Sequence, residues 1–254
     1  MEKFVALYDS HIGFELRGGH KVPLHDGGAI KIATQFIKDF KPDHTILGGD
    51  MLDCGCVSHH NHGKPGATEG MKLLQDAKLC RDTLIKPVEA HTKKTLTYIT
   101  GNHEAWLEDL EIQVPALEGM FSVEKVLGLG SKWKVIPQGQ SHKLGKLMFL
   151  HGDQVKGGQY PAKWAVEAYE RNVRFGHFHC FQAFSKTSAL EDNTKTGMVI
   201  PCLCKKGPLY GGGAPNKWSQ GFLWGYIHDD GSYSDYVSLI SKGKATINGK
   251  VYTA

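Results

Sequence analysis

The chain has 254 residues, of which 41% are hydrophobic and 10% aromatic; it can bury a large core, and its composition excludes a disordered, collagen-like or coiled-coil protein. Its formal net charge of +4 permits a polyanionic substrate, but no run of Lys or Arg indicates a nucleic-acid-binding arm. The opening apolar stretch is too short for a secretory signal, and no apolar run approaches the roughly 18 residues of a membrane span. We therefore expect a soluble cytoplasmic protein with no membrane partner and mostly reduced thiols.

Five short apolar runs predict buried β-strands. They occupy residues 4–8, 45–47, 96–100, 147–150 and 173–175. Each run is rich in β-branched, aromatic or leucine side chains, and each ends in Gly, Asp or His.

Helical spacing of apolar residues between these runs predicts three helices. The first covers residues 30–40, the second covers residues 71–84 and stops near Pro87, and the third covers residues 164–169 with Pro161 near its first turn. Strands that alternate with helices in this way predict an α/β layered domain.

The last quarter of the chain has a different pattern. Residues 198–203, 221–227 and 234–240 predict strands, and the dipeptides Asp-Gly at 230–231 and Asn-Gly at 248–249 are typical of hairpin turns. This region therefore predicts antiparallel pairing.

A Gly- and Pro-rich segment at residues 206–216 interrupts this antiparallel region. It forms either a flexible wall over a site or a long connection. The sequence contains no internal repeat and no interdomain linker, so we expect residues 1–254 to form a single domain.

Each of the five early strands is followed by side chains that can bind metal ions. They are Asp9 and His11, then Asp50 and Asp53, then Asn102 and His103, then His151, then His177 and His179. Ligands of α/β sheets bind beyond the carboxyl ends of the strands. One such motif alone is more often structural, but five in succession are hard to explain by packing.

The chemistry of this set fits a binuclear metal centre. Asp and Asn supply oxygen ligands and His supplies nitrogen, a mixture that suits Mn²⁺, Fe or Zn²⁺ better than Ca²⁺. We expect two divalent ions, with Mn²⁺ favoured and Fe, Zn²⁺ or Ni²⁺ as alternatives. Asp50 is the natural bridging carboxylate, because the glycines before it let the backbone approach closely.

The motifs Asp-x-His, Gly-Asp-x-x-Asp, Gly-Asn-His-Glu, His-Gly and Gly-His-x-His follow one another between residues 9 and 179. This ordered set resembles the calcineurin-like metallophosphoesterases, a family that includes Mre11-type nucleases, cyclic-nucleotide phosphodiesterases, purple acid phosphatases and Ser/Thr phosphatases. The segment after Gly197 also looks like that of small phosphoesterases encoded by bacteriophages, for which the host cytoplasm is the expected location.

The resemblance implies a four-layer α/β/β/α sandwich and a metal-dependent phosphoesterase. It implies one ion bound by Asp9, His11, Asp50 and His179 and a second bound by Asp50, Asn102, His151 and His177. In this family a metal-bridging hydroxide attacks phosphorus, which would make His103 the general acid or transition-state stabiliser and Asp53 the residue that orients it.

One position departs from the family pattern. The Ser/Thr phosphatase branch has an arginine directly after Gly-Asp-x-x-Asp, where this chain has Cys54. An arginine would bind a monoester phosphate in a bidentate manner, so its absence favours phosphodiester hydrolysis, including a nuclease acting on DNA or RNA. The alternatives are a phosphomonoesterase or protein phosphatase, and a non-catalytic metal-binding scaffold.

Two further groups of residues have alternative interpretations. Cys54, Cys56, Cys202 and Cys204 are either free thiols or a four-thiolate zinc site, although the Cys-x-Cys spacing is tighter than usual. The histidines at 59, 60 and 62 either border the substrate or are solvated, and Trp106 either stacks on a base or packs in the core.

Overall fold

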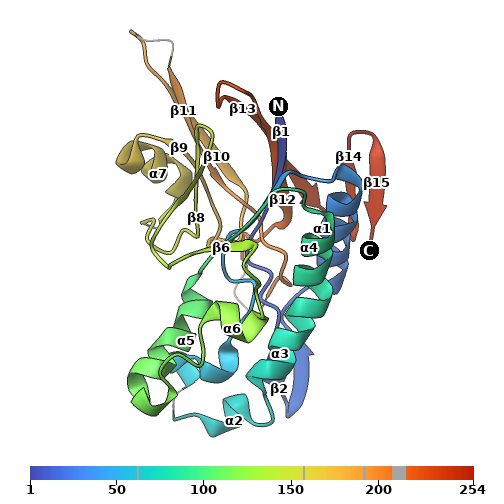
Figure 1. Ribbon diagram of the computed structural model, residues 1–254, viewed down its shortest axis with the longest axis vertical. Helices are drawn as coiled ribbons and strands as arrows, with labels where there is room; N and C mark the ends of the chain where they lie inside the picture. Colours follow the sequence, from blue (N-terminus) through green and yellow to red (C-terminus); the bar gives the residue numbers. More distant parts are fainter. Residues whose placement is uncertain (62, 157, 191–192, 208–215) are drawn as a thin grey trace.

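The computed structural model describes residues 1–61, 63–156, 158–190, 193–207 and 216–254, which include two large β-sheets (Figure 1). The first sheet has the strand order β13 (Tyr233–Ile240), β12 (Gln220–Ile227), β1 (Glu2–Leu7), β4 (His44–Leu47), β5 (Thr95–Ile99) and β6 (Trp133–Ile136). Strands β1, β4, β5 and β6 are parallel, whereas β12 pairs antiparallel with both β1 and β13. The antiparallel pairing predicted for the end of the chain is confirmed here.

The second sheet has the strand order β10 (Gln182–Thr187), β11 (Thr194–Val199), β9 (Asn172–Phe175), β8 (Leu147–Leu150) and β7 (His142–Leu144). Its central strands β8, β9 and β11 are parallel. Two small ribbons complete the strands: β2 (Phe14–Arg17) with β3 (His20–Pro23), and β14 (Lys244–Ile247) with β15 (Lys250–Thr253).

The helices with α-helical hydrogen bonding in the described part of the chain are α1 (Gly27–Phe40), α2 (Pro65–Thr68), α3 (Leu73–Cys80), α4 (Lys86–His91), α5 (Asn102–Gln113), α6 (Val123–Leu127) and α7 (Pro161–Tyr169). Short 3-10 turns lie at η1 (Gly55–Val57), η2 (His59–Asn61) and η4 (Pro115–Leu117). None of the described helices has the length and apolar character needed to cross a membrane.

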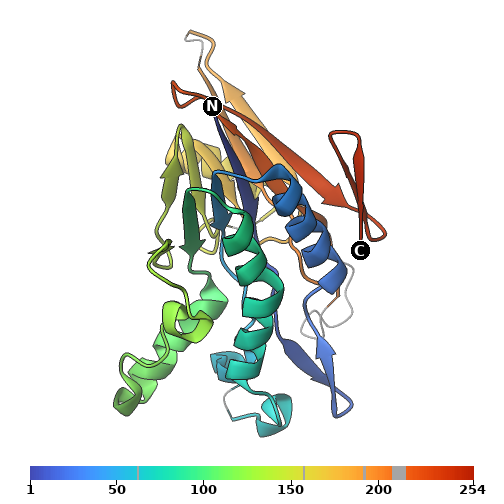
Figure 2. The same cartoon turned by 45° about the vertical axis from the view of Figure 1, so that its right-hand side comes forward.

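The two sheets pack face to face, with helices on their outer sides. Val5 and Leu7 of β1 face the core under α1 and α4, whereas Phe4 and Ala6 face the second sheet, where Phe4 meets Phe149 edge to face. This alternation follows from the two-residue period of a strand. Helix α7 covers the far side of the second sheet, and α1 and α4 lie side by side over the first (Figures 1 and 2). The four-layer α/β/β/α prediction is confirmed.

One helix prediction was wrong at its end, because the helix does not stop at Pro87. Helix α3 continues through a π-helical turn, η3 (Arg81–Ile85), into α4. The N–H of Lys86 donates to the carbonyl of Arg81, five residues back. Pro87 then stands in the first turn of α4, a position that tolerates a residue without an N–H.

The strand predicted over residues 198–203 is also placed differently. Strand β11 ends at Val199, and the chain then passes Pro201 in an irregular segment held by isolated bridges from Cys202 to Gln220 and from Cys204 to His25. Proline has no N–H for the ladder, which explains the early end. Of the Gly- and Pro-rich segment at 206–216, residues 208–215 lie outside the described residues.

A buried ion pair joins the two sheets. Arg174 of β9 is fully buried, and its Nε donates to Asp235 Oδ2 of β13 at 2.5 Å. Its Nη1 and Nη2 donate to the carbonyl and the hydroxyl of Thr196 on β11, both at 2.9 Å. The backbone carbonyl of Arg174 also accepts a hydrogen bond, from the Tyr8 hydroxyl at 3.2 Å. A buried charge is tolerated only when it is paired, so Arg174 must keep its contacts with Asp235 and Thr196. These contacts fix how the two sheets face each other near the predicted ligands.

Candidate metal centre

The carboxyl ends of five strands meet at one edge of the two sheets. In the first sheet Leu7 of β1 pairs with Leu47 of β4, which pairs in turn with Tyr98 of β5. In the second sheet Leu150 of β8 pairs with Phe175 of β9. These strands therefore end level with one another, and the residues that follow them are brought together.

One group of donors consists of Asp9, His11 and His179, all of them buried and all with ligand atoms within 4.8 Å of one another. The Nε2 atoms of His11 and His179 are 3.1 Å apart. His179 Nε2 lies 3.5 Å from Asp9 Oδ1. Two strand ends in different sheets thus supply three donors that converge on one point.

A second group consists of Asp50, His151 and His177, again with ligand atoms within 4.8 Å of one another. His151 Nε2 lies 3.2 Å from Asp50 Oδ2 and 3.1 Å from the side-chain oxygen of Asn102. The other ring nitrogen of His151 contacts the carbonyl of Gly48 at 3.0 Å, which fixes the orientation of the ring. The structure therefore places Asn102 with this second group.

Asp50 lies between the two groups. Its Oδ2 is 3.2 Å from His151 Nε2 and 3.8 Å from His11 Nε2. Its Oδ1 accepts the backbone N–H of His103 at 2.9 Å. A carboxylate with one oxygen anchored and the other facing both groups has the placement that a bridging ligand needs.

Gly49, directly before Asp50, has a φ of 99°, and a Cβ atom there would stand 2.5 Å from His151 Nδ1. Only glycine allows both this backbone conformation and this close approach.

The predicted ligands also carry unusual backbone strain. Ten non-glycine residues in the described ranges have a left-handed φ, and half of them are predicted ligands: Asp9, His11, Asp50, His177 and His179. Each such residue costs about 1–3 kcal/mol, and strain of this kind clusters at functional sites. The distribution favours a functional role for these strand ends over simple packing.

Features of the donors themselves fit bound cations. Asp9 Oδ1 is buried and has no hydrogen-bond partner among the described residues. Its other oxygen accepts the N–H of His177 at 2.9 Å. The facing Nε2 atoms of His11 and His179 also need a cation or a proton between them, because two lone pairs repel. Buried carboxylate and imidazole donors of this kind suit borderline divalent ions.

The electrostatics of the site also favour bound cations. Burial lowers the pKa of His151, but the charge and hydrogen bond of Asp50 and the charge of Asp9 outweigh it and raise that pKa to about 10. Burial opposes ionisation of Asp50, yet the neighbouring His151 and His103 hold its pKa well below the usual range. The cluster thus attracts positive charge, and a metal ion would compete with protons for these nitrogens.

His103 borders both groups, in the first turn of α5. Its Nδ1 lies 2.7 Å from the backbone oxygen of Asp53 and 3.4 Å from the Asp53 carboxylate. That carboxylate is nearer to His11 Nδ1, at 3.1 Å. Asp53 therefore contacts His103 through two groups, and the shorter contact comes from its backbone oxygen.

The pKa of His103 is raised to about 9. Burial lowers it, but the charge of Asp50 and the hydrogen bond and charge of Asp53 more than offset the burial. A histidine held in this way is protonated at neutral pH and can donate a proton.

Glu104 supports the site, although the sequence reasoning gave it no role. Its buried carboxylate accepts the backbone N–H groups of Asp50, Leu52 and Gly101 at 2.9, 2.9 and 3.0 Å. It also accepts the Tyr98 hydroxyl at 2.8 Å. One side chain thus connects the ends of β4 and β5. The signal was present in the sequence, because a Glu at the third position of a helix often caps that helix.

A pocket of about 580 Å³ opens beside His103. Phe14, Leu16, Leu24, Met71 and Trp106 supply its apolar walls, and Glu15, Asp53, Ser58, His60 and Asn61 are among its polar ones. The rings of His59 and His60 pack edge-on against Trp106, which itself lies 4.2 Å from the His103 ring between centroids. His60 and Trp106 therefore border this pocket, while His62 lies outside the described residues.

Comparison with solved structures supports the fold. Vps29 from Chaetomium thermophilum is similar over 100% of this chain and 99% of its own, with 10% sequence identity and a TM-score of 0.50. The chain has the metallophosphoesterase fold. A dimetal phosphatase from Danio rerio is similar over 99% of this chain and 98% of its own, with 10% identity and a TM-score of 0.45.

A purple acid phosphatase from yellow lupin is similar over 99% of this chain and 52% of its own, with 13% identity and a TM-score of 0.42. No protein-family model and no curated protein matches the sequence. The expected relationship to bacteriophage-type members therefore stays a prediction.

The four cysteines considered for a zinc site do not gather in one place. All six cysteines are free, and Cys202 and Cys204 group with His179 rather than with Cys54 and Cys56. Cys54 instead lies in the core that the first sheet shares with its helices. The four-thiolate interpretation was wrong, because sequence spacing does not reveal which loops meet.

We predict that Glu104→Ala destabilises the protein by about 3 kcal/mol or more, because three buried N–H groups and a hydroxyl lose their acceptor. Urea unfolding followed by circular dichroism measures this change. Glu108→Ala, on an exposed position of the same helix, serves as control and should change the free energy of unfolding by no more than about 0.5 kcal/mol. Equal effects of the two substitutions would contradict the role of Glu104.

Proposed function

We propose that this protein hydrolyses phosphate esters with the help of two divalent cations, and that phosphodiesters are its preferred substrates. The observation that carries the proposal is the convergence of six nitrogen- and oxygen-bearing residues around Asp50, with a histidine of raised pKa beside them. Such a set of donors is costly to bury without a cation.

Asp9, His11, Asp50 and His179 would hold one cation, and Asp50, Asn102, His151 and His177 the other. When bound, two such ions lower the pKa of water and offset negative charge on phosphoryl oxygens. Mn²⁺ is the ion we favour, with Fe, Zn²⁺ and Ni²⁺ as the alternatives that this mixture of donors accepts.

His103 would act on the substrate itself. The contact of its Nδ1 with the Asp53 backbone oxygen leaves Nε2 as the nitrogen available for proton donation. The raised pKa keeps a proton on the ring at neutral pH, so His103 can protonate the leaving oxygen or stabilise charge on the phosphoryl group. Asp53 would position His103 through this contact.

The pocket beside His103 supports a diester. None of its described lining residues is Lys or Arg, and two of them, Glu15 and Asp53, are acidic. A neutral or aromatic ester substituent would be accepted there by Phe14, Leu16 and Trp106. A diester carries such a substituent on each side of its single negative charge.

The position of Cys54 supports the same choice. Cys54 is buried in the core and brings no guanidinium to the site. A monoester dianion would lack the bidentate partner that an arginine provides at this point. A nuclease acting on DNA or RNA is one form of this proposal, because a base could stack on the aromatic wall of the pocket.

The two alternatives make different demands on the molecule. A phosphomonoesterase or protein phosphatase would need other cationic groups to bind the dianion. A non-catalytic scaffold would bind metal but would not need the protonated His103 beside the metal ligands.

We predict that metal-stripped protein regains hydrolysis of bis-nitrophenyl phosphate when Mn²⁺ is added, and that His103→Ala lowers kcat by roughly 10²-fold or more while metal binding persists. His91→Ala, at the end of α4, is the matched histidine control and should retain full activity. Full activity of His103→Ala would refute the acid role. An inactive wild type that still binds metal would support the scaffold.

The diester preference has its own test. We predict a higher kcat/KM for bis-nitrophenyl phosphate than for mono-nitrophenyl phosphate, because the apolar walls of the pocket accept a second, neutral aromatic ester group. Leu16→Ala should raise KM for the diester more than it lowers kcat, since it removes binding area and no reacting group. Faster turnover of the monoester would contradict the diester preference and leave the metal-dependent chemistry intact.

A further inference from the structure

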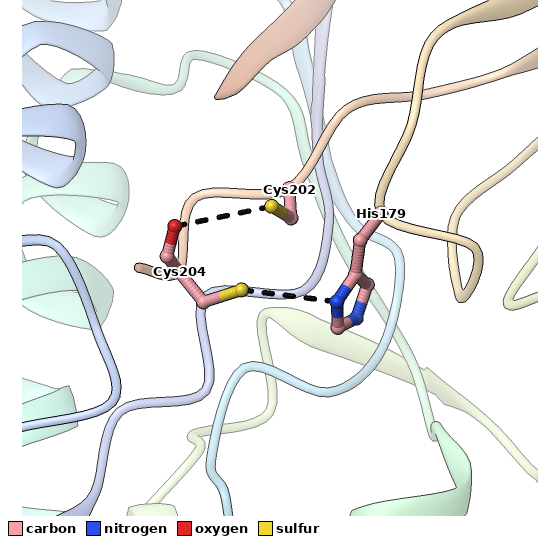
Figure 3. Close-up of side chains that lie close together, drawn as sticks. All are labelled: His179, Cys202 and Cys204. Atoms are coloured by element: carbon pink, nitrogen blue, oxygen red, sulfur yellow. Dashed lines mark hydrogen bonds between the residues drawn. The ribbon is translucent and has the colours of Figure 1, made fainter. Parts of the chain in front are cut away.

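Two cysteines stand directly behind one of the predicted metal ligands. Cys202 and Cys204 follow β11 and are buried, with exposures of 0% and 2%. Figure 3 shows the Cys204 sulfur directed toward the ring of His179, while the Cys202 sulfur contacts the backbone oxygen of Cys204 at 3.9 Å. Cys204 Sγ lies 3.9 Å from His179 Nδ1, and one ligand atom from each of the three residues lies within 4.8 Å of the other two.

A network of backbone hydrogen bonds holds these side chains in place. The N–H of Cys202 donates to the Ser219 carbonyl at 3.1 Å, and the N–H of Ser219 donates to the His179 carbonyl at 2.8 Å. On the other side, the N–H of Leu203 donates to the Asp9 carbonyl at 3.1 Å. The two thiols are therefore fixed to the same backbone that carries His179 and Asp9, so the cluster is largely preorganised.

The donor set differs in kind from that of the dinuclear centre. Two sulfur atoms and an imidazole nitrogen are the ligands that Zn²⁺ and other thiophilic ions select, whereas Mn²⁺ prefers oxygen. Bond lengths of about 2.3 Å to sulfur and 2.0 Å to nitrogen would require only a small contraction of the cluster.

Ser219 offers a further oxygen donor. Its carbonyl lies 3.3 Å from Cys202 Sγ, and its buried hydroxyl has no hydrogen-bond partner among the described residues. The residue beside the two thiols thus also has unused hydrogen-bonding capacity.

We propose that His179, Cys202 and Cys204 form a binding site for one thiophilic divalent cation of the Zn²⁺ type, separate from the dinuclear centre. His179 links the two sites, because its Nε2 faces Asp9 while its Nδ1 faces Cys204. Because one imidazole ring faces both sites, a cation bound at Nδ1 alters metal affinity at the dinuclear centre. The site itself does not depend on the proposed hydrolysis.

Titration of the metal-free full-length protein with Co²⁺ tests this site directly. Thiolate ligands give a sulfur-to-cobalt charge-transfer band in the near ultraviolet, and the nitrogen and oxygen donors of the dinuclear centre give none. We predict that the band appears in the wild type, falls at least twofold in Cys202→Ser and in Cys204→Ser, and disappears in the double variant. Cys56→Ser, a half-buried thiol outside the cluster, should keep the full band.

A wild type without the band, or a double variant that keeps it, would overturn the proposal. If the variants do not fold, as judged by circular dichroism, alkylation mapping of the wild type tests the thiol site instead. Cys202 and Cys204 should then be alkylated more slowly with Co²⁺ than without it while the rate at Cys56 is unchanged, and rates at Cys202 and Cys204 that do not respond to Co²⁺ would refute the site. No hydrolysis is measured, so failure here is distinct from failure of the phosphoesterase proposal.

Discussion

The buried carboxylate of Asp50 is the feature on which the rest of the site depends. It is 2% exposed, it stands where the ends of both sheets meet, and it faces His11 of one group and His151 of the other. A buried anion is stable only when positive charge surrounds it. The histidines around Asp50 supply part of that charge, and two bound cations would supply the remainder. The same requirement explains why the backbone N–H of His103 donates to Asp50 and why the charges of Asp50 and Asp53 raise the pKa of the His103 ring, so that this ring can donate a proton.

Much of the surrounding structure serves to hold this arrangement. Five of the predicted ligand residues adopt strained left-handed conformations, and such strain persists only where neighbouring contacts compensate for it. Within the first sheet, Glu104 compensates for this strain by accepting hydrogen bonds from three backbone N–H groups around Asp50. Between the sheets, the buried ion pair of Arg174 and Asp235 holds β9 of the second sheet against β13 of the first. Glu104 and Arg174 thus each make several hydrogen bonds, which offset the free-energy cost of burying polar groups.

The sequence predicted the strands and the donors that follow them because both signals are local. Apolar runs marked β1, β4, β5, β8 and β9 to within about two residues, and each donor motif lies directly after its strand. The errors have a common cause, which is contact between distant parts of the chain. Pro87 is tolerated because a π-helical turn precedes it, and Cys204 meets His179 rather than Cys54 because of how the loops pack. No spacing pattern in the sequence carries that information.

The metal positions are the central claim, and anomalous X-ray diffraction at the manganese edge from crystals grown with Mn²⁺ tests it most directly. We predict two anomalous peaks on either side of Asp50, one against Asp9, His11 and His179 and the other against Asn102, His151 and His177. His11, Asp53 and His103 also have ligand atoms within 4.8 Å of one another and form the competing position. A single peak at that competing position, or no peak beside Asp50, would contradict the two-ion centre and remove His103 from the role of proton donor.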